Sequence, residues 1–330
     1  MKYLFLLIGG LAAAMGVFLI ITFSFKPGDS RKIQPEGPIV VILKATSKTN
    51  PVMFWNVVQM GINEAAREFG VEVEIDGPDY EYQIERQINI FNKIIERRPP
   101  LIVLAATDYK LLAEPVKKAA ENNIPVITMD SGVDSTYPVS FIATDNIEAG
   151  RKAGKELLRL NPEGTDGSVA IISHVKETAT SIERETGIRE VLGDWMIKNT
   201  WYCDNDKSKA YKYTMKILEN PDIKGIIALN EIVTLGVAKA VKEKNASERV
   251  VVIGFDSAPD ELAYLENDVI KATIVQRPYN MGYISIKTAV EYLQGKKVAP
   301  VIDTGSVLIT ADNMFKREYQ ELLFPVKNSK

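Results

Sequence analysis

The segment LIVLAATDYKLLAEPVKKAAENNIPVITMD, residues 101–130, indicates the fold class of the chain most clearly. It begins with an apolar run at 101–104, continues through a segment of helical composition, and returns to an apolar run at 125–129 that ends in an aspartate. The same order of run, helix, run and aspartate recurs from KGIIALNE (224–231) to VVVIGFD (250–256). Short apolar runs that alternate with helical segments are typical of α/β folds. The repetition therefore predicts two similar α/β lobes in one chain.

The rest of the chain from residue 38 continues this alternation. Ile84, Ile88, Phe91 and Ile95 are spaced four, three and four residues apart, which places them on one face of a helix. The candidate strands are almost entirely apolar, as expected for parallel strands that helices cover on both faces. They are residues 39–43, 71–75, 101–104, 125–129, 168–172, 225–229 and 250–254.

The length and composition fit a globular protein of about two domains. Of 330 residues, 46% are hydrophobic and 25% are charged, which excludes disorder over most of the chain. Residues 33–330 carry 36 basic and 42 acidic residues, and this balance argues against a nucleic-acid surface. One cysteine, Cys203, and one histidine, His174, argue against a disulfide or a structural zinc site. His174 is interpreted as an ordinary loop residue after the strand at 168–172.

The first 32 residues contain a long apolar run. Residues 3–25 carry no charge, and 23 helical residues span roughly 35 Å, enough to cross the hydrocarbon core of a membrane. Signal peptides have a shorter apolar region of roughly 7–15 residues, so we expect an uncleaved transmembrane helix followed by a linker. A cleaved signal peptide is the alternative. The lysines and arginines on the two sides of the run do not decide its orientation.

Polar residues follow three of the candidate strands. Asp130, Asn230 and Asp256 each come directly after an apolar run, where ligands bind in open α/β sheets. Each of them alone is explained as a helix cap or a turn residue. Three at equivalent places in two lobes favour a shared ligand, and their planar hydrogen-bonding groups match neighbouring sugar hydroxyls. Phe54 and Trp55, at the start of the first helix, could stack on a sugar ring or pack in the core.

Several segments between about residues 38 and 324 carry a further signal. They are Asn50-Pro51, Phe54-Trp55, IPVITMD (124–130), FIATDN (141–146), Arg184 with Gly187 and Ile188, ALNE (228–231), VIGFD (252–256) and ATIVQRP (272–278). Together they resemble the type 1 periplasmic sugar-binding family, which includes ribose-, galactose- and xylose-binding proteins. The same fold forms the effector domain of lac-repressor-type regulators.

The resemblance implies roles for individual residues. Asn50, Phe54 and Trp55 would be polar and stacking contacts from the first lobe. Asp130 would accept a hydrogen bond from a hydroxyl, and Arg184 would clamp the sugar from the second lobe. No cofactor and no metal are implied. The ring of contacts would be completed by Asn205, Asn230, Asp256 and Gln276.

Three features depart from the ribose-binding pattern. The first loop, between Pro51 and Gly61, is about two residues longer than in ribose-binding proteins. Ser131 stands where ribose binders tend to have arginine, and Asn205 stands where an aromatic residue is common. These changes move the expected ligand away from ribose, toward a xylose-like sugar or another small pentose or hexose.

The resemblance also implies that the two lobes exchange segments. Residues 33–330 would form the sugar-binding region, after an anchor segment at 1–32. Three crossings between the lobes would serve as a hinge, and binding would close the lobes on the sugar. The crossings are expected near 144–146, 277–278 and 305–306, with lobe one holding about 38–143 and 279–305 and lobe two about 144–278 and 306–325.

Other functions are less compatible with the sequence. A sugar hydrolase would use paired carboxylates such as Asp130 and Asp256, but no GxSxG, P-loop or GxGxxG motif is present, so a binding protein is favoured over an enzyme. A transcription regulator would need a basic helix-turn-helix, where residues 1–37 have the apolar run instead. Two membrane partners stay open: the permease of an ABC sugar transporter, and a sensor such as a histidine kinase. In both cases the protein would be held at the cell membrane with its binding region outside the cytoplasm.

Overall fold

The computed structural model describes residues 36–49, 52–161 and 167–324. The described residues belong to one compact unit. Asn50 and the apolar run at 3–25 lie outside the described residues. Within those residues, no helix combines the length and the apolar character that a membrane span needs.

Lobe one is built on a parallel sheet with the strand order β11-β5-β4-β3-β1-β2 in the described chain. Side chains alternate between its two faces. Ile39 and Val41 of β1 pack toward helices α2 and α10, and Val40 and Ile42 pack toward α3 and α4. The elements are β1 (Ile39–Ile42), α2 (Met53–Phe69), β2 (Val73–Asp76), α3 (Ile84–Arg97), β3 (Ile102–Leu104), α4 (Ala113–Glu121), β4 (Val126–Met129), β5 (Ser140–Ala143), α10 (Pro278–Leu293) and β11 (Val301–Asp303).

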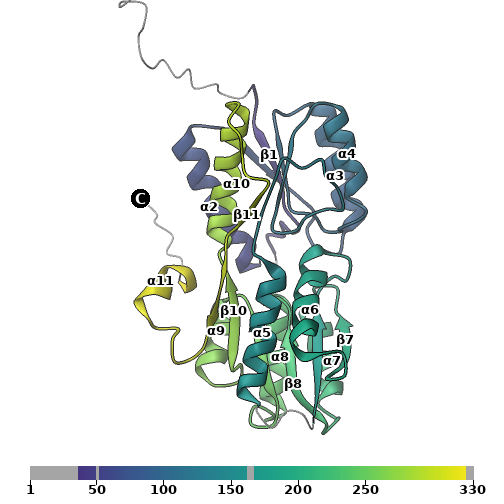
Figure 1. The fold of residues 1–330 in the computed structure, drawn as a ribbon, viewed down its shortest axis with the longest axis vertical. Coiled ribbons are helices and arrows are strands. Elements are labelled where there is room, and N and C mark those ends of the chain that lie inside the picture. Colours follow the sequence, from purple (N-terminus) through teal and green to yellow (C-terminus); the bar gives the residue numbers. More distant parts are fainter. Residues whose placement is uncertain (1–35, 50–51, 162–166, 325–330) are drawn as a thin grey trace, which may run out of the picture. The chain divides into compact units, whose positions relative to one another are not determined.

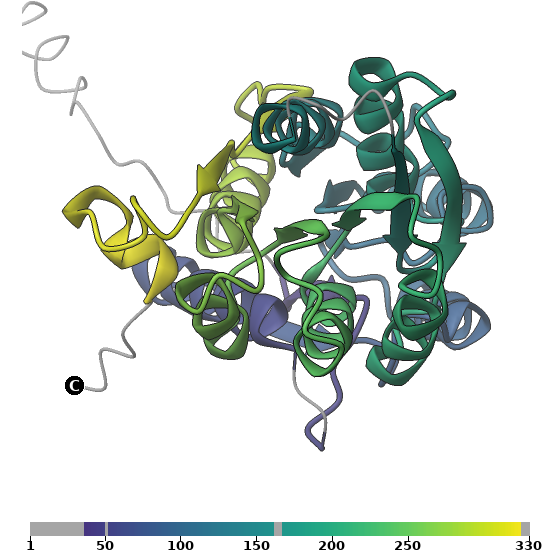
Figure 2. The same ribbon diagram turned by 90° about the horizontal axis from the view of Figure 1, so that it is seen from below.

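Lobe two repeats this plan with the order β12-β10-β9-β8-β6-β7 within the same described ranges, and only β12 runs antiparallel to its neighbour. Figure 2 shows α5 and α6 on one side of this sheet and α7, α8 and α9 on the other. The elements are α5 (Asn146–Leu160), β6 (Ser168–Ser173), α6 (Ala179–Leu192), β7 (Ile197–Tyr202), α7 (Lys207–Ile217), β8 (Ile223–Ala228), α8 (Glu231–Glu243), β9 (Val251–Phe255), α9 (Pro259–Glu266), β10 (Ala272–Gln276), β12 (Ser306–Ile309) and α11 (Arg317–Leu323).

The prediction of two α/β lobes with parallel sheets is confirmed. Every candidate strand overlaps a strand of one of the two sheets, and the helix predicted from Ile84 to Ile95 is α3. The chain passes from one sheet to the other after β5, after β10 and after β11. The strands that follow or precede these passages, β5, β10, β11 and β12, were not among the candidates, and neither was β7.

Two helices from distant parts of the chain pack closely in lobe one. Figure 1 shows α2 and α10 side by side. A Cβ atom on Gly61 of α2 would lie 2.0 Å from the Tyr279 carbonyl oxygen, and one on Gly282 of α10 would lie 2.1 Å from the Val58 carbonyl oxygen. Because both obstacles are backbone atoms, only glycine allows this approach at either position. The pair brings the start of α2 to the edge of the sheet where the strands end.

Candidate functional site

A small polar cavity lies where the carboxyl ends of the strands of the two lobes face each other. Its volume is about 40 Å³, close to the roughly 30 Å³ that one water molecule takes up in the liquid. Groups from opposite lobes contact each other directly around it. The lining residues are Lys44, Val52, Phe54, Trp55, Glu81, Asp130, His174, Thr180, Arg184, Asn205, Asn230, Glu231, Asp256 and Gln276.

The structure brings the predicted site residues together. All of those that it describes line this one cavity, although they come from segments far apart in the sequence. Asn50 is the exception only because it lies outside the described residues. Polar lining residues that the sequence did not single out are Lys44, Glu81, His174, Thr180 and Glu231.

The two strand-end aspartates have the same local geometry. Asp130 follows β4 with φ of 61°, and Asp256 follows β9 with φ of 81°, both in the left-handed region that aspartate tolerates better than most residues. The Asp130 N–H donates to the Ile142 carbonyl at 2.9 Å, and the Asp256 N–H donates to the Ile274 carbonyl at 3.0 Å. The similarity of the two lobes therefore extends to the residues at the cavity.

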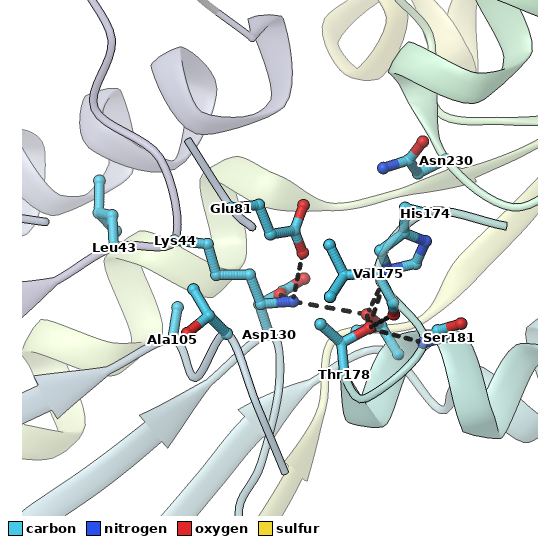
Figure 3. A network of polar contacts seen from close by, with 12 residues as sticks. Leu43, Lys44, Glu81, Ala105, Asp130, His174, Val175, Thr178, Ser181 and Asn230 are labelled. Carbon is cyan, nitrogen blue, oxygen red and sulfur yellow. Dashed lines mark hydrogen bonds and ion pairs between the residues drawn. The ribbon is translucent and has the colours of Figure 1, made fainter. Parts of the chain in front are cut away.

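Lobe one pairs its carboxylates with a buried lysine, as Figure 3 shows. Lys44 Nζ lies 2.8 Å from Asp130 Oδ2 and 3.4 Å from Glu81 Oε1, and the Lys44 side chain is 3% exposed. Burial raises the pKa of Glu81, and the nearby Lys44 opposes this. Lys44 also donates to Thr180 Oγ1 of lobe two at 3.4 Å, so this cluster reaches across the cavity.

Asp256 in lobe two is held mainly by uncharged donors. Gln276 Nε2 donates to Asp256 Oδ1 at 2.8 Å, and the Glu231 N–H donates to Oδ2 at 3.0 Å. Burial raises the pKa of Asp256, while Arg184 lowers it. The Asp256 carboxylate is thus desolvated, and its two hydrogen-bond donors hold it in one orientation.

Glu231 connects the two lobes through its side chain. Its carboxylate accepts from the backbone N–H groups of Met53 at 3.0 Å and Phe54 at 2.9 Å. These N–H groups belong to the first turn of α2, whose N-cap residue Val52 supplies no side-chain cap. Burial and the neighbouring Asp256 raise the pKa of Glu231 to about 7, more than these two hydrogen bonds lower it.

Arg184 is fixed by several contacts at once. Its Nε donates to Asn146 Oδ1 at 2.9 Å, its Nη1 donates to the Leu229 carbonyl at 2.6 Å, and its guanidinium lies 4.6 Å from the centre of the Phe255 ring. One turn further along α6, a Cβ atom on Gly187 would lie 2.0 Å from a backbone oxygen of α5. Close packing of α5 and α6 therefore sets the place from which Arg184 enters the cavity.

Asn205 bridges the two lobes. Its Nδ2 donates to Glu81 Oε2 of lobe one at 2.8 Å, and its Oδ1 accepts from Asn230 Nδ2 of lobe two at 2.8 Å. Asn230 also caps α8, because its Oδ1 accepts from the Val233 N–H at 3.0 Å. Asn230 is therefore both a helix cap and a residue of the cavity lining.

Phe54 and Trp55 likewise pack in the core and face the cavity. The rings of Phe54 and Trp55 pack edge to face, with centroids 5.0 Å apart and planes at 87°. They belong to the core cluster of lobe one and also line the cavity.

His174 is 2% exposed and lines the cavity, so its interpretation as an ordinary loop residue is wrong. In the described part of the chain, no group of three or more His, Cys, Asp or Glu side chains is placed to hold a metal ion.

Known proteins are similar to this chain in sequence and in fold. The family model of the periplasmic binding protein domain matches residues 39–297. A D-allose-binding periplasmic protein of Escherichia coli is 28% identical over 273 residues, which cover 79% of this chain and 86% of that protein. The similar proteins are described as binding proteins or transporter components.

Two solved structures are also similar. A carbohydrate transporter solute-binding protein from Agrobacterium radiobacter, in complex with D-arabinose, is 32% identical with a TM-score of 0.82, covering 88% of this chain and 99% of its own. An ABC transporter solute-binding protein from Agrobacterium vitis, with bound D-fucose, is 32% identical with a TM-score of 0.83, covering 87% and 100%. With the family model matching most of its length, the chain belongs to the periplasmic binding protein family.

Proposed function

We propose that the protein binds a neutral monosaccharide between its two lobes and delivers it to the permease of an ABC sugar transporter. It acts as a binding protein and not as an enzyme. The single observation that carries this proposal is the convergence of Asp130, Arg184, Asn230, Asp256 and Gln276, from both lobes, on one buried polar cavity. Relatives with this fold are described as binding D-allose, D-arabinose and D-fucose.

Sugar entry requires the lobes to separate. A monosaccharide is larger than a cavity of about 40 Å³, so the side chains that now pair across it would exchange partners with sugar hydroxyls. Asn205 and Glu231, which contact lobe one from lobe two, are the groups that would do so. The three passages of the chain between the sheets would act as the hinge, and ligand would shift the equilibrium toward the closed form.

The polar groups favour an uncharged ligand with several hydroxyls. Buried carboxylates and amides offer paired donors and acceptors that suit vicinal hydroxyls, and the Phe54–Trp55 pair offers apolar surface for the C–H face of a ring. A pentose or a hexose fits this chemistry. Location at the outer face of the cell membrane follows from the same function, with the apolar run at 3–25 as the proposed anchor.

Calorimetry tests the proposal. The full chain, kept in a detergent without a sugar headgroup, is titrated with D-xylose, D-ribose, D-allose, D-arabinose and D-fucose. We expect saturable binding of at least one of these aldoses. Asp256→Ala and Arg184→Ala should weaken it by about 100-fold or more, because each leaves buried polar partners unpaired.

Arg67→Ala and Asp79→Ala, at exposed positions outside the cavity, are the matched controls and should bind like the wild type. No heat with any of the five sugars, or wild-type affinity in both cavity variants, would refute the proposal. The partner has a separate test. Permease and ATPase genes beside this one would support delivery to a transporter, whereas a histidine kinase gene there would support the sensor alternative.

A further inference from the structure

His174 and Lys44 occupy equivalent places in the two lobes. Lys44 lies just beyond β1 and His174 directly follows β6, and these are the fifth strands in the two sheet orders given above. Both residues are 2% exposed, and both line the cavity. Where lobe one presents a cation to the cavity, lobe two therefore presents an imidazole ring.

One nitrogen of this ring is held by two threonines (Figure 3). His174 Nε2 lies 3.0 Å from Thr180 Oγ1 and 3.1 Å from Thr178 Oγ1. The Thr178 hydroxyl donates its proton to the Val175 carbonyl at 2.9 Å, and Thr180 Oγ1 accepts from Lys44 at 3.4 Å. A hydroxyl has only one proton to donate, so while Thr178 donates to Val175 its contact with Nε2 is a hydrogen bond only if Nε2 carries a proton. The tautomer with Nε2 protonated satisfies all of these contacts at once.

The other nitrogen, Nδ1, then carries a lone pair. It is buried and has no hydrogen-bond partner among the described residues. Burial, together with Lys44 and Arg184, lowers the pKa of His174 well below 6.5, so the ring stays neutral and the lone pair stays available at neutral pH. Gln276 Oε1 is a second buried acceptor of the cavity lining that has no partner in the described chain. Buried acceptors are normally paired, so both indicate donors that come from outside the chain.

We propose that His174 Nδ1 accepts a hydrogen bond from one hydroxyl of the bound sugar and thereby selects sugars that carry this hydroxyl. The inference rests on the proposed sugar-binding function and names a residue that sets its specificity. A carboxylate or phosphate beside Nδ1 would place its acceptor oxygens against the Nδ1 lone pair, and the two would repel each other. A cationic amine would meet Lys44 and Arg184, whose positive charges reach His174. A neutral hydroxyl donor is therefore the group that fits.

The chain contains a single histidine, which makes a direct test feasible. Full-length, untagged protein labelled with ¹⁵N in histidine alone gives NMR signals from one ring. The probe is the aldose of the five-sugar panel that binds with the lowest Kd. We expect the free protein at pH 7 to show Nε2 protonated, and the Nδ1 signal to move toward that of a hydrogen-bonded nitrogen as the aldose saturates the site. A proton on Nδ1, or an Nδ1 signal unchanged at saturation, would overturn the inference.

Two substitutions separate the roles of the two nitrogens. The amide oxygen of asparagine is as many bonds from the backbone as Nδ1, and the amide nitrogen of glutamine is as many as Nε2. His174→Gln therefore keeps a donor for Thr178 and Thr180 but has no acceptor at the position of Nδ1, whereas His174→Asn keeps an acceptor at that position. Each variant is titrated with the same aldose and its monodeoxy analogues, and thermal unfolding verifies the fold.

We expect one monodeoxy analogue to bind the wild type and His174→Asn about 10- to 100-fold more weakly than the parent aldose. In His174→Gln, the same analogue and the parent should bind about equally. If every analogue loses as much affinity relative to the parent aldose in His174→Gln as in the wild type, the inference is overturned. The proposed sugar binding would not be affected by that result. If no aldose binds the wild-type protein, the proposed function fails, and this inference fails with it.

Discussion

The two halves of the site share a backbone geometry and differ in charge. Asp130 and Asp256 end equivalent strands in the same left-handed conformation. Asp130 meets the ammonium group of Lys44 at 2.8 Å, whereas Asp256 receives its hydrogen bonds from Gln276 and from a backbone N–H. The place of Lys44 is taken in lobe two by the neutral His174.

This difference shows where selectivity resides in such a fold. The sheets bring strand ends together in the same way in both lobes, so the framework alone does not distinguish one ligand from another. Lobe one largely balances its carboxylates internally. Lobe two keeps desolvated carboxylates and unpaired acceptors that await donors from a ligand. Substitutions at single residues of each lobe test this contrast.

The largest expected effect comes from removing the cation of lobe one. Lys44→Met leaves Glu81 and Asp130 buried without their ammonium partner, and losing one member of a buried ion pair costs about 3–5 kcal/mol. We expect the free energy of unfolding, measured in urea at pH 7, to fall by that amount. Lys209→Met, which breaks an exposed pair with Asp204, is the matched control and should cost less than about 1 kcal/mol. Equally small losses would show that Lys44 does not balance lobe one.

A smaller effect is expected from the titration of Glu231 in lobe two. Its pKa is raised from 4.5 to about 7, so the folded protein keeps the proton over a range in which the unfolded chain has lost it. The contribution of Glu231 to stability is therefore full below pH 4.5 and is lost as the pH rises to about 7. The loss amounts to at most about 3 kcal/mol.

Glu231→Gln should flatten this part of the dependence of the melting temperature on pH between 5 and 8. The variant keeps a carbonyl oxygen that can accept from the start of α2 and loses the titrating group. Glu266→Gln, at an exposed position at the end of α9, serves as the control and should keep the wild-type profile. If Glu231→Gln and the wild type follow the same curve, Glu231 titrates in the folded protein as it does in the unfolded chain.

The smallest effect is expected at the bridge between the lobes. Asn205→Gly keeps a residue that tolerates the left-handed conformation, with φ of 56°, and removes the hydrogen bonds to Glu81 and Asn230. We expect the Kd for the best aldose to rise about 5- to 10-fold, because the sugar loses the neutral hydrogen bonds that Asn205 would exchange to it, worth roughly 1 kcal/mol. Asn245→Gly, also left-handed but exposed beyond α8, should leave the Kd unchanged. A tighter-binding Asn205→Gly variant would mean that this bridge opposes sugar binding.

Local patterns were sufficient for the framework and for much of the cavity. Apolar runs that end in a polar residue identified β4, β8 and β9, and with them Asp130, Asn230 and Asp256. The same patterns did not identify β7 or β11, because their side chains are largely exposed or half-buried and their sequences are mixed. Edge strands lack the continuous apolar signal of central strands.

The residues that were missed depend on partners far away in the chain. Lys44 is buried because Asp130 and Glu81 come close in space, and nothing around residue 44 shows this. Glu231 resembles an ordinary acidic residue in a first helical turn, yet it caps a different helix in the other lobe. His174 could have been found by applying the strand-end rule to β6 as well as to β8 and β9.

The pairing of α2 with α10 has a consequence for how the chain is made. Its glycines, Gly61 and Gly282, lie near opposite ends of the described chain, whereas lobe two draws all its strands but β12 from one continuous stretch. During synthesis, the face of the lobe-one sheet that α2 and α10 share is only partly covered until α10 has emerged, while lobe two can already assemble. The nascent chain therefore needs shielding from aggregation over most of its length. A product truncated before Pro278 would lack α10 and would expose the apolar side chains that α10 covers, which favours aggregation.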